Sequence, residues 1–206
     1  TRLSDGSTVE VAAKHRVVAA LDCELIPEKM PESVTLWQSH LENGKKRNHG
    51  EWMPARGAEP AHLKTVPYTL PAKTDRKQRT IYTLSMPVSS GDHPPVVLQP
   101  ETKIRVRGRI ASSHRIWFGM TLSRENGDFA GRFQTILPAE EFKSGEPFEV
   151  VLNLTDYELD PSLAKWAESL PKTPYGLIVK SVWCHTLWDP AGLQVSEMAL
   201  TTPTDR

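Results

Sequence analysis

The 206-residue sequence predicts an all-β chain folded as a sandwich of two antiparallel sheets. Short segments of alternating apolar and polar residues recur along the chain, which is typical of strands with one buried and one solvated face. Seventeen prolines and twelve glycines lie between these segments and supply frequent turns. Helical periodicity is scarce. Many short strands with turn signals between them indicate a β-sandwich or barrel.

The first 75 residues are predicted to form an N-terminal extension packed on a main domain of residues 76–206. Ser7–Ala12 and His15–Leu21 are expected strands. Residues 26–75 contain six prolines and a polar tract at 42–50, so we expect a long irregular excursion with one short strand at Val34–Trp37.

The main domain shows the clearest strand pattern. Apolar residues occupy every second position of 102–111, 116–122 and 148–154, which predicts strands with one buried face. One short helix is expected at Pro161–Leu170, where Asp160 is suited to the N-cap and Pro161 to the first helical position. The remaining expected strands are 80–88, 132–137, 177–187 and 193–200.

An arginine row is expected on one face of the strand 102–111. Arg105, Arg107 and Arg109 would project from the same side about 7 Å apart, two strand rises each. They would form either an anion-binding or acidic-polysaccharide surface, or a solvated face paired across strands with acids such as Glu149.

Two of the six tryptophans are candidates for ligand contact. Trp117 lies on the opposite strand face from Phe118 and is expected to point outward, and Trp188 directly precedes a turn at 189–192. Sugar-binding sites use exposed aromatic rings, because the C–H-rich faces of pyranoses stack on π-surfaces. Half-buried packing is the alternative for both side chains.

The stretch 124–131 is predicted to reverse the chain between two strands. Asn126-Gly127 favours a type I′ turn, although Asp128 and Gly131 also suit a longer loop or a bulge. Glu125 and Asp128 are free to point outward, where their carboxylates could bind a metal ion or a sugar.

Several function classes are disfavoured. Lys+Arg and Asp+Glu are both 25, and this neutral balance argues against nucleic-acid binding. No apolar run has the length of a membrane span. No nucleophile elbow, zincin, Walker or dinucleotide motif is present, so an enzyme is not favoured.

The sequence leaves the role of three sets of reactive side chains open. A hydrolase would take its carboxylates first from Glu140, Glu141, Asp156 and Asp160. His40, His49 and His62 share the excursion with three glutamates and could hold a metal. Cys23 and Cys184 are either buried thiols or a disulfide.

A run of segments in the main domain carries a family resemblance: 103–109, 116–122, Gly145–Tyr157, Ile178–Trp183 and Gly192–Leu200. Their order resembles the galactose-binding-like jelly roll, in the branch shared by some carbohydrate-binding modules and the complex I intermediate-associated protein family. The resemblance implies a ligand site on a concave sheet face or on loops at one end. It also implies a possible structural calcium, for which Glu197 is the matching acid.

A second, shorter resemblance concerns residues 2–13, which are similar to the strand pair of FecR-type bacterial signalling regulators. It implies a periplasmic or extracellular bacterial protein. Together these features favour non-catalytic binding of a polysaccharide or other glycan at Trp117, Trp188, Arg105, Arg107, Glu125 and Asp128. A protein-interaction or scaffold domain of the same fold is the alternative, and a glycan-active hydrolase is the third hypothesis.

Overall fold

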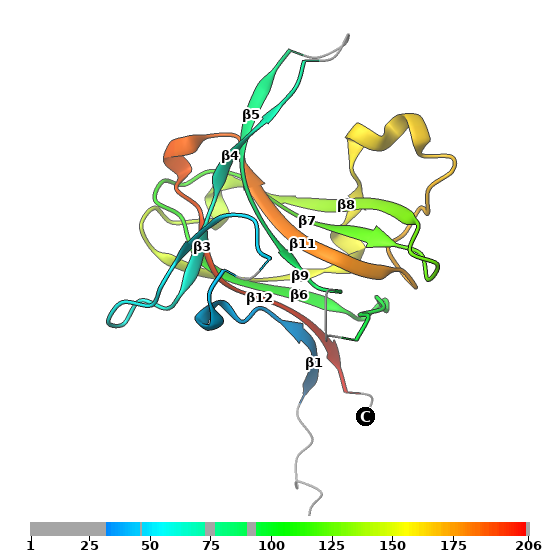
Figure 1. Cartoon of the computed structure of the whole chain (residues 1–206), viewed down its shortest axis with the longest axis horizontal. Coiled ribbons are helices and arrows are strands. Elements are labelled where there is room, and N and C mark those ends of the chain that lie inside the picture. The colour runs from blue at the N-terminus through cyan, green and yellow to red at the C-terminus, as the bar shows by residue number, and fades with distance from the viewer. Residues whose placement is uncertain (1–31, 46, 73–76, 90–93, 205–206) are drawn as a thin grey trace, which may run out of the picture. The chain divides into compact units, whose positions relative to one another are not determined.

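The computed structural model describes residues 32–45, 47–72, 77–89 and 94–204 (Figure 1). The chain divides into two units, Thr1–Val34 with Thr204–Arg206, and Thr35–Pro203. The second unit is the β-sandwich discussed below. The strands expected at 7–12 and 15–21, the FecR-like segment and Cys23 lie outside the described residues.

Two sheets make up the sandwich, and every pair along their strand orders is antiparallel. Sheet I has the order β2-β3-β12-β6-β9, with β1 also paired to β12. Sheet II has the order β10-β8-β7-β11-β5-β4. The predicted all-β two-sheet architecture is confirmed.

The bounds of the strands follow the expected pattern in the second half of the chain. The strands of sheet I are β1 (Ser33–Gln38), β2 (Glu51–Met53), β3 (His62–Lys64), β6 (Lys103–Arg109), β9 (Pro147–Asn153) and β12 (Gln194–Pro203). Those of sheet II are β4 (Val66–Leu70), β5 (Arg79–Pro87), β7 (Ile116–Ser123), β8 (Phe129–Leu137), β10 (Glu158–Leu159) and β11 (Ile178–Thr186).

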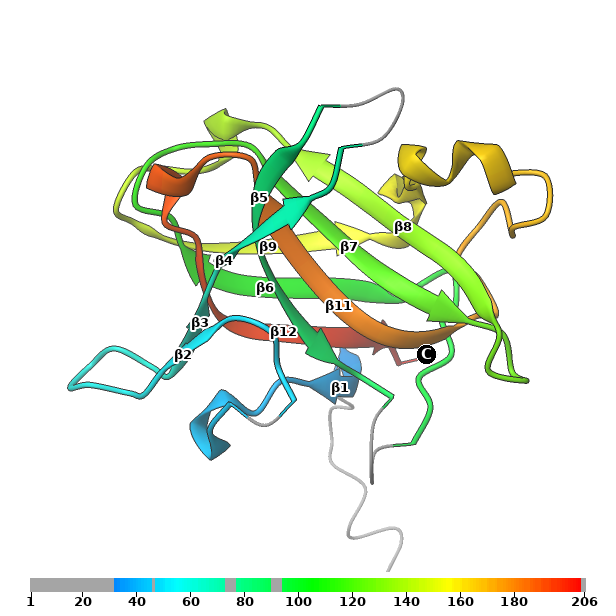
Figure 2. The same cartoon turned by 45° about the horizontal axis from the view of Figure 1, so that its top comes forward.

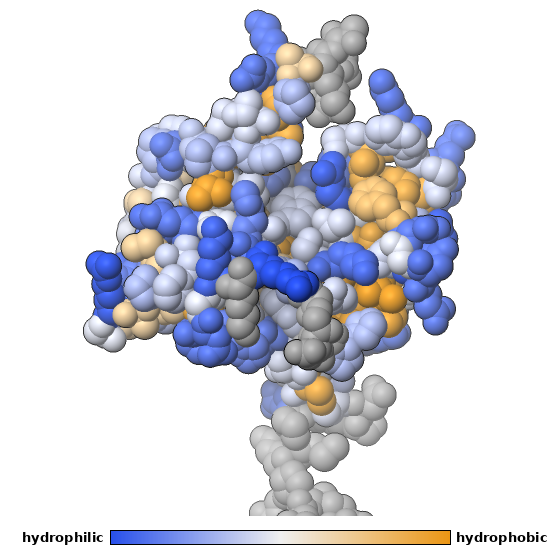
Figure 3. Space-filling model, in the orientation of Figure 1, coloured by the Kyte–Doolittle hydropathy of each residue, from blue (hydrophilic) through white to orange (hydrophobic). Residues whose placement is uncertain are grey.

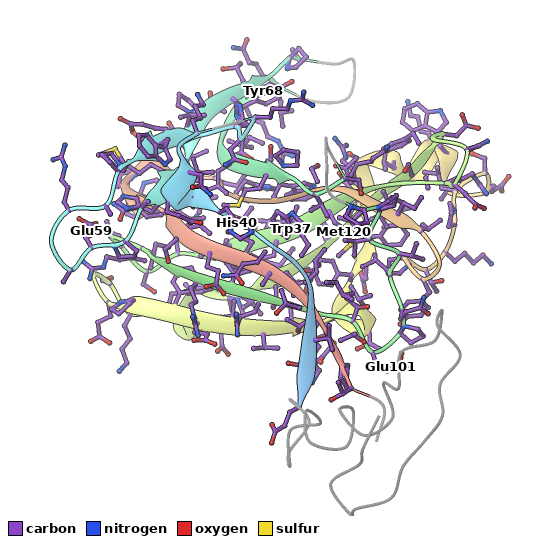
Figure 4. The ribbon with its side chains drawn as sticks, turned by 60° about the horizontal axis from the view of Figure 1, so that its bottom comes forward. Trp37, His40, Glu59, Tyr68, Glu101 and Met120 are labelled. Atoms are coloured by element: carbon purple, nitrogen blue, oxygen red, sulfur yellow. The ribbon has the colours of Figure 1, made fainter. Side chains whose placement is uncertain are left out.

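The core lies between the two sheets and is built by alternation along each strand. Phe118, Met120 and Leu122 of β7 are buried, as are Val106 of β6 and Met198 of β12. Met120 lies among the side chains between the sheets in Figure 4. Because successive residues of a strand point to opposite faces, the residues between these buried ones form the outer faces of the sheets.

The expected excursion at 26–75 contains more regular structure than predicted. Besides β1, the described part of it forms β2, β3 and β4, which join both sheets. These strands have only three to five residues, too few to show alternation. Pro67 lies in β4, an edge strand, where a missing N–H is tolerated. The described residues from 35 to 72 thus belong to the same unit as the main domain.

All helical segments of the described chain are short 3₁₀ turns: η1 (Leu41–Asn43), η2 (Ala139–Glu141), η3 (Leu154–Asp156), η4 (Pro161–Trp166) and η5 (Asp189–Ala191). The predicted helix at 161–170 forms as η4. Its N-cap is Asp160, as expected, and the Asp160 carboxylate accepts a hydrogen bond of 2.8 Å from the Ser162 N–H. The helix is 3₁₀ rather than α and ends at Trp166.

Cys184 lies on β11 with its side chain in the core and is a free thiol. Burial raises its pKa well above the usual range of a cysteine, so the thiol stays protonated. The predicted buried thiol is therefore confirmed for Cys184. The alternative disulfide between Cys23 and Cys184 is not formed in this structure.

The core on β7 can be tested with one substitution and a surface control. We expect Phe118→Ala to lower the free energy of unfolding by about 3–5 kcal/mol, because it leaves a cavity between the sheets. Val151→Ala, on the outer face of sheet I where the valine is exposed, should change it by less than about 0.5 kcal/mol. Chemical denaturation measures both, and equal effects would contradict the assignment of the two faces.

Candidate functional site

The two tryptophans selected from the sequence line the same cleft. Trp117 on β7 and Trp188 after β11 border an open cleft of about 530 Å³ together with His114, Arg115 and Leu187. Trp188 is 45% exposed and Trp117 is partly exposed. The rings of His114 and Trp188 are 5.5 Å apart at an angle of 49°. Flat, partly exposed rings around an open cleft are suited to stacking on a ligand.

Hydrogen bonds fix the two loops that carry this cleft. The Thr186 hydroxyl and the Ala191 N–H both donate to the Trp188 carbonyl, at 3.1 and 3.2 Å. On the other side, the Ser113 hydroxyl donates to the Ala139 carbonyl at 2.6 Å. The Ser113 N–H donates to Ser144 Oγ at 2.8 Å. The cleft is therefore held in shape without a ligand, which reduces the entropy lost on binding.

An aromatic row continues from the cleft across the outer face of sheet II, and consists of Trp117, His185 and Trp183. Trp117 is paired with His185 across β7 and β11, and the two rings stack at 5.1 Å with only 8° between their planes. His185 stacks in turn on Trp183 at 5.5 Å and 21°. Figure 2 shows β8, β7, β11 and β5 side by side, with β4 and β5 extending beyond the sheet.

Gly119 makes room for the last ring of the aromatic row. It lies opposite Trp183 in the β7–β11 register. A Cβ at position 119 would be only 2.2 Å from the Trp183 indole, so the indole lies directly against the backbone of β7. A larger residue at this position would force the indole away from the sheet.

Polar and charged groups surround the aromatic row. Arg115 lies with its guanidinium carbon 6.0 Å from the centre of the Trp117 ring. Arg132 on β8 is bonded to Asp160 at 3.0 Å and to Ser162 Oγ at 2.8 Å. Gln134, partly buried, is paired with Gly119, which is paired on its other side with Trp183. Such donors and acceptors around flat rings can bind hydroxyl groups.

His185 is neutral in the folded protein at neutral pH. Burial between the two indoles lowers its pKa from 6.5 to about 4. The charges of Arg79 and Arg132 contribute to this lowered pKa, and Asp160 partly opposes them. The histidine therefore acts as a flat uncharged ring.

Arg105 and Arg107, the other predicted ligand-binding residues, lie on the outer face of sheet I. Glu149, Arg107 and Glu197 are direct cross-strand neighbours on β9, β6 and β12. Arg107 bonds Glu149 at 2.8 Å and Glu197 at 3.5 Å, and Arg105 bonds Glu197 at 2.8 Å. The hydrogen bond from Arg107 lowers the pKa of Glu149. The structure thus favours the paired interpretation for Arg105 and Arg107, whereas no carboxylate among the described residues pairs with Arg109.

Glu197 does not fit the calcium site that the family resemblance implies. Both of its carboxylate oxygens are within 3.5 Å of a guanidinium group. A divalent cation would compete directly with these two positive charges. In the part of the chain that the structure describes, no group of three His, Cys, Asp or Glu side chains is placed to hold a metal ion.

The hairpin between β7 and β8 is longer than a two-residue type I′ turn. The Gly127 N–H donates to the Arg124 carbonyl at 3.0 Å, and Gly127 has a φ of 89°. Asn126 Oδ1 accepts from the Asp128 N–H at 3.0 Å, while its amide donates to the Asp128 carboxylate at 2.8 Å. Glu125 and Asp128 are exposed. A ligand role for them stays a prediction.

The carboxylates considered for a hydrolase have structural partners or lie in loops. Asp160 caps η4 and pairs with Arg132. Asp156 accepts hydrogen bonds from Asn153 and Thr155 at 3.4 and 3.3 Å. Glu140 and Glu141 are exposed on η2. Among the excursion histidines, His62 Nδ1 bonds the Pro60 carbonyl at 3.0 Å.

Trp183, His185, Arg79 and Arg115 are residues of this face that were not predicted from the sequence as candidates for the site. Residues 177–187 were expected to be a central strand, and the mostly apolar composition hid its two faces. The signal was present, because Val182 and Cys184 are buried on one face while Trp183 and His185 alternate with them. The pairing of β11 with β7 could not be predicted from a single sequence.

Comparison with known proteins gives structural similarity only. No protein-family model matches the chain, and no curated protein sequence matches it. Among solved structures, the chain is similar to the family 11 carbohydrate-binding module of a cellulosomal cellulase from Clostridium thermocellum. The TM-score is 0.45 and the identity 10%, over 86% of this chain and 91% of the module.

A second structure of a Clostridium thermocellum family 11 module, in complex with a β-1,3-1,4-mixed-linked tetrasaccharide, gives a TM-score of 0.44 and 12% identity. It covers 85% of this chain and 91% of that one. These modules are jelly-roll β-sandwiches, the class that the sequence pattern resembles. At this level of identity the similarity concerns the fold alone.

The neutral state of His185 predicts a pH-dependent stability. Above pH 6.5 the histidine is neutral in both the folded and the unfolded protein, so it does not change the free energy of unfolding. Between pH 6.5 and about 4 the unfolded chain binds a proton that the folded protein excludes, so stability falls as the pH falls. Between these pH values the wild-type protein should lose about 3 kcal/mol of its free energy of unfolding. We expect His185→Phe to abolish this loss. Parallel stability–pH curves for wild type and variant would contradict the pKa shift.

The hairpin carboxylates can be tested for a calcium role. Replacing Glu125 and Asp128 together by alanine should change the free energy of unfolding by less than about 0.5 kcal/mol, since both side chains are exposed. The same small change is expected with calcium and with a chelator. A calcium-dependent rise in melting temperature that wild type shows and the double variant lacks would establish a metal site.

Proposed function

We propose that this protein binds carbohydrate without chemical conversion, on the outer face of sheet II. The observation that carries the proposal is the open cleft shared by two aromatic rings, Trp117 on β7 and Trp188 in the segment after β11. A sugar ring stacks through its C–H face on such surfaces, and neighbouring polar groups take its hydroxyls.

The aromatic row supports an extended ligand rather than a single sugar. Trp117, His185 and Trp183 extend the aromatic side chains from β7 onto β11, with the His185 ring stacked between the two indoles, so a ligand would contact the exposed parts of the indoles. Gln134 of β8 and the guanidinium of Arg115 border the aromatic row. A chain of sugars could contact the cleft with one residue and the aromatic row with the next. A periplasmic or extracellular location stays a prediction from the sequence.

A second candidate function, docking of a protein partner, is favoured by apolar side chains at the same place. Ile136, paired with Trp117 across β7 and β8, is 47% exposed, and Leu187 in the cleft is 41% exposed. Apolar residues gathered around a cleft mark interaction sites. On the side of the molecule in Figure 3, however, hydrophobic residues form separate patches divided by hydrophilic ones.

Single tryptophan substitutions test carbohydrate binding. We expect the wild-type protein to bind at least one oligosaccharide on a glycan array. Trp117→Ala and Trp188→Ala should each weaken that binding about tenfold in calorimetry, because each removes one stacking surface. Trp166→Ala is the matched control, since Trp166 is 54% exposed but lies on η4 outside the cleft.

The outcomes separate the two candidate functions. If no saccharide binds, or if the three variants bind alike, the carbohydrate proposal is wrong. Ile136→Ser and Leu187→Ser remove the exposed apolar side chains that a protein partner would contact. A protein complex that these two substitutions disrupt would instead support the docking function.

A further inference from the structure

The outer face of sheet II carries arginines that are free to meet a ligand. Arg79, Arg115 and Arg132 lie on this face or at its border, and Arg132 is paired with Asp160. Arg79 and Arg115 are exposed, and neither has a carboxylate partner among the residues that the structure describes. This differs from sheet I, where Arg105 and Arg107 are neutralised by glutamates.

Arg115 lines the proposed sugar site, and Arg79 lies on β5, the strand next to β11. Arg115 lines the cleft, two residues before Trp117, with its guanidinium carbon 6.0 Å from the Trp117 ring. Arg79 begins β5, the strand that pairs Thr83 with His185. Its charge acts on His185 strongly enough to lower the pKa of that histidine.

Asp189 directly follows Trp188 at the start of η5, but it does not line the cleft. None of the five residues that line the cleft is acidic. Of the two nearest acids in the strand order, Asp160 is bonded to Arg132, and Glu158 on β10 lies beyond β8 from the aromatic row. The site therefore offers unneutralised positive charge beside flat neutral rings.

We propose that the site selects acidic polysaccharides, chains of uronic-acid residues, over neutral ones; this inference rests on the proposed function. The sugar ring stacks on Trp117 while its carboxylate reaches Arg115, and a second carboxylate along the chain reaches Arg79. A guanidinium pairs with a carboxylate through two parallel hydrogen bonds, which a neutral hydroxymethyl group cannot form. A neutral chain leaves both arginines without an anionic partner.

Matched pairs of oligosaccharides test this selectivity. The probes are hexamers of β-1,4-glucan and β-1,4-glucuronan, of β-1,4-mannan and β-1,4-mannuronan, and of α-1,4-galactan and α-1,4-galacturonan. The members of each pair differ in the oxidation state of C6. By calorimetry at low salt, we expect the acidic member of at least one pair to bind about tenfold or more tightly than its neutral counterpart. The difference should shrink as sodium chloride screens the charges.

Arginine variants identify which positive charge binds the carboxylates of the acidic hexamer. Arg79→Gln and Arg115→Gln should each weaken binding of the acidic hexamer about tenfold and change the neutral hexamer by less than about twofold. Arg109→Gln is the matched control, because Arg109 is exposed on the opposite sheet. Thermal unfolding confirms that each variant is folded.

Each outcome decides between the two proposals. Equal affinity for acidic and neutral members, or equal behaviour of the three arginine variants, overturns the selectivity and leaves the carbohydrate site standing. Binding of neither member of any pair by the folded wild type, together with an empty glycan array, overturns the carbohydrate site and the selectivity with it.

Discussion

The register between β7 and β11 determines both the core and the candidate site. Phe118 is paired with Cys184, and both side chains are buried between the sheets, while the adjacent pair Trp117 and His185 faces outward. Because side chains alternate with a period of two, a slip of one residue would bury the aromatic row and expose the core. The apolar contacts that hold Phe118 inside therefore also hold the aromatic row outside. Stability and the proposed binding surface depend on the same pairing.

The two outer faces of the sandwich use charge differently. On sheet I, the cross-strand row of Glu149, Arg107 and Glu197 satisfies its charges internally, in a geometry that antiparallel pairing provides at no further cost. The paired charges of this face are solvated and are not available to bind a ligand. On sheet II, rings and Gly119 occupy the positions beside the arginines, and no acid in the described part of the chain pairs with Arg79 or Arg115. The distribution of partners, rather than the number of arginines, distinguishes the two faces.

The alternation of buried and exposed residues along individual strands could be predicted from the sequence. The side-chain contacts that depend on how the strands pair could not. The strands at 102–111 and 116–122, the N-cap at Asp160 and the outward direction of Trp117 were all visible as local patterns. The partners of Arg107 and the approach of Trp188 to Trp117 required a register between segments about 40 to 90 residues apart. Strands β2 to β4 were missed because they are short and rich in polar residues or proline. Local periodicity therefore identifies which side chains leave the core, and only the assembled sheets determine which of them meet.

His185 shows why the centre of the site is neutral and its border charged. A protonated imidazole would gain attraction from the two indole faces, but it would lose hydration and be repelled by Arg79 and Arg132. The low pKa of about 4 shows that desolvation and these arginines dominate over Asp160. The positive charge of this face is thus carried by exposed guanidinium groups at the border, where water compensates them until a ligand arrives. Shape recognition by stacked rings and charge recognition by arginines are therefore separate, and each can be altered without unfolding the sheet beneath.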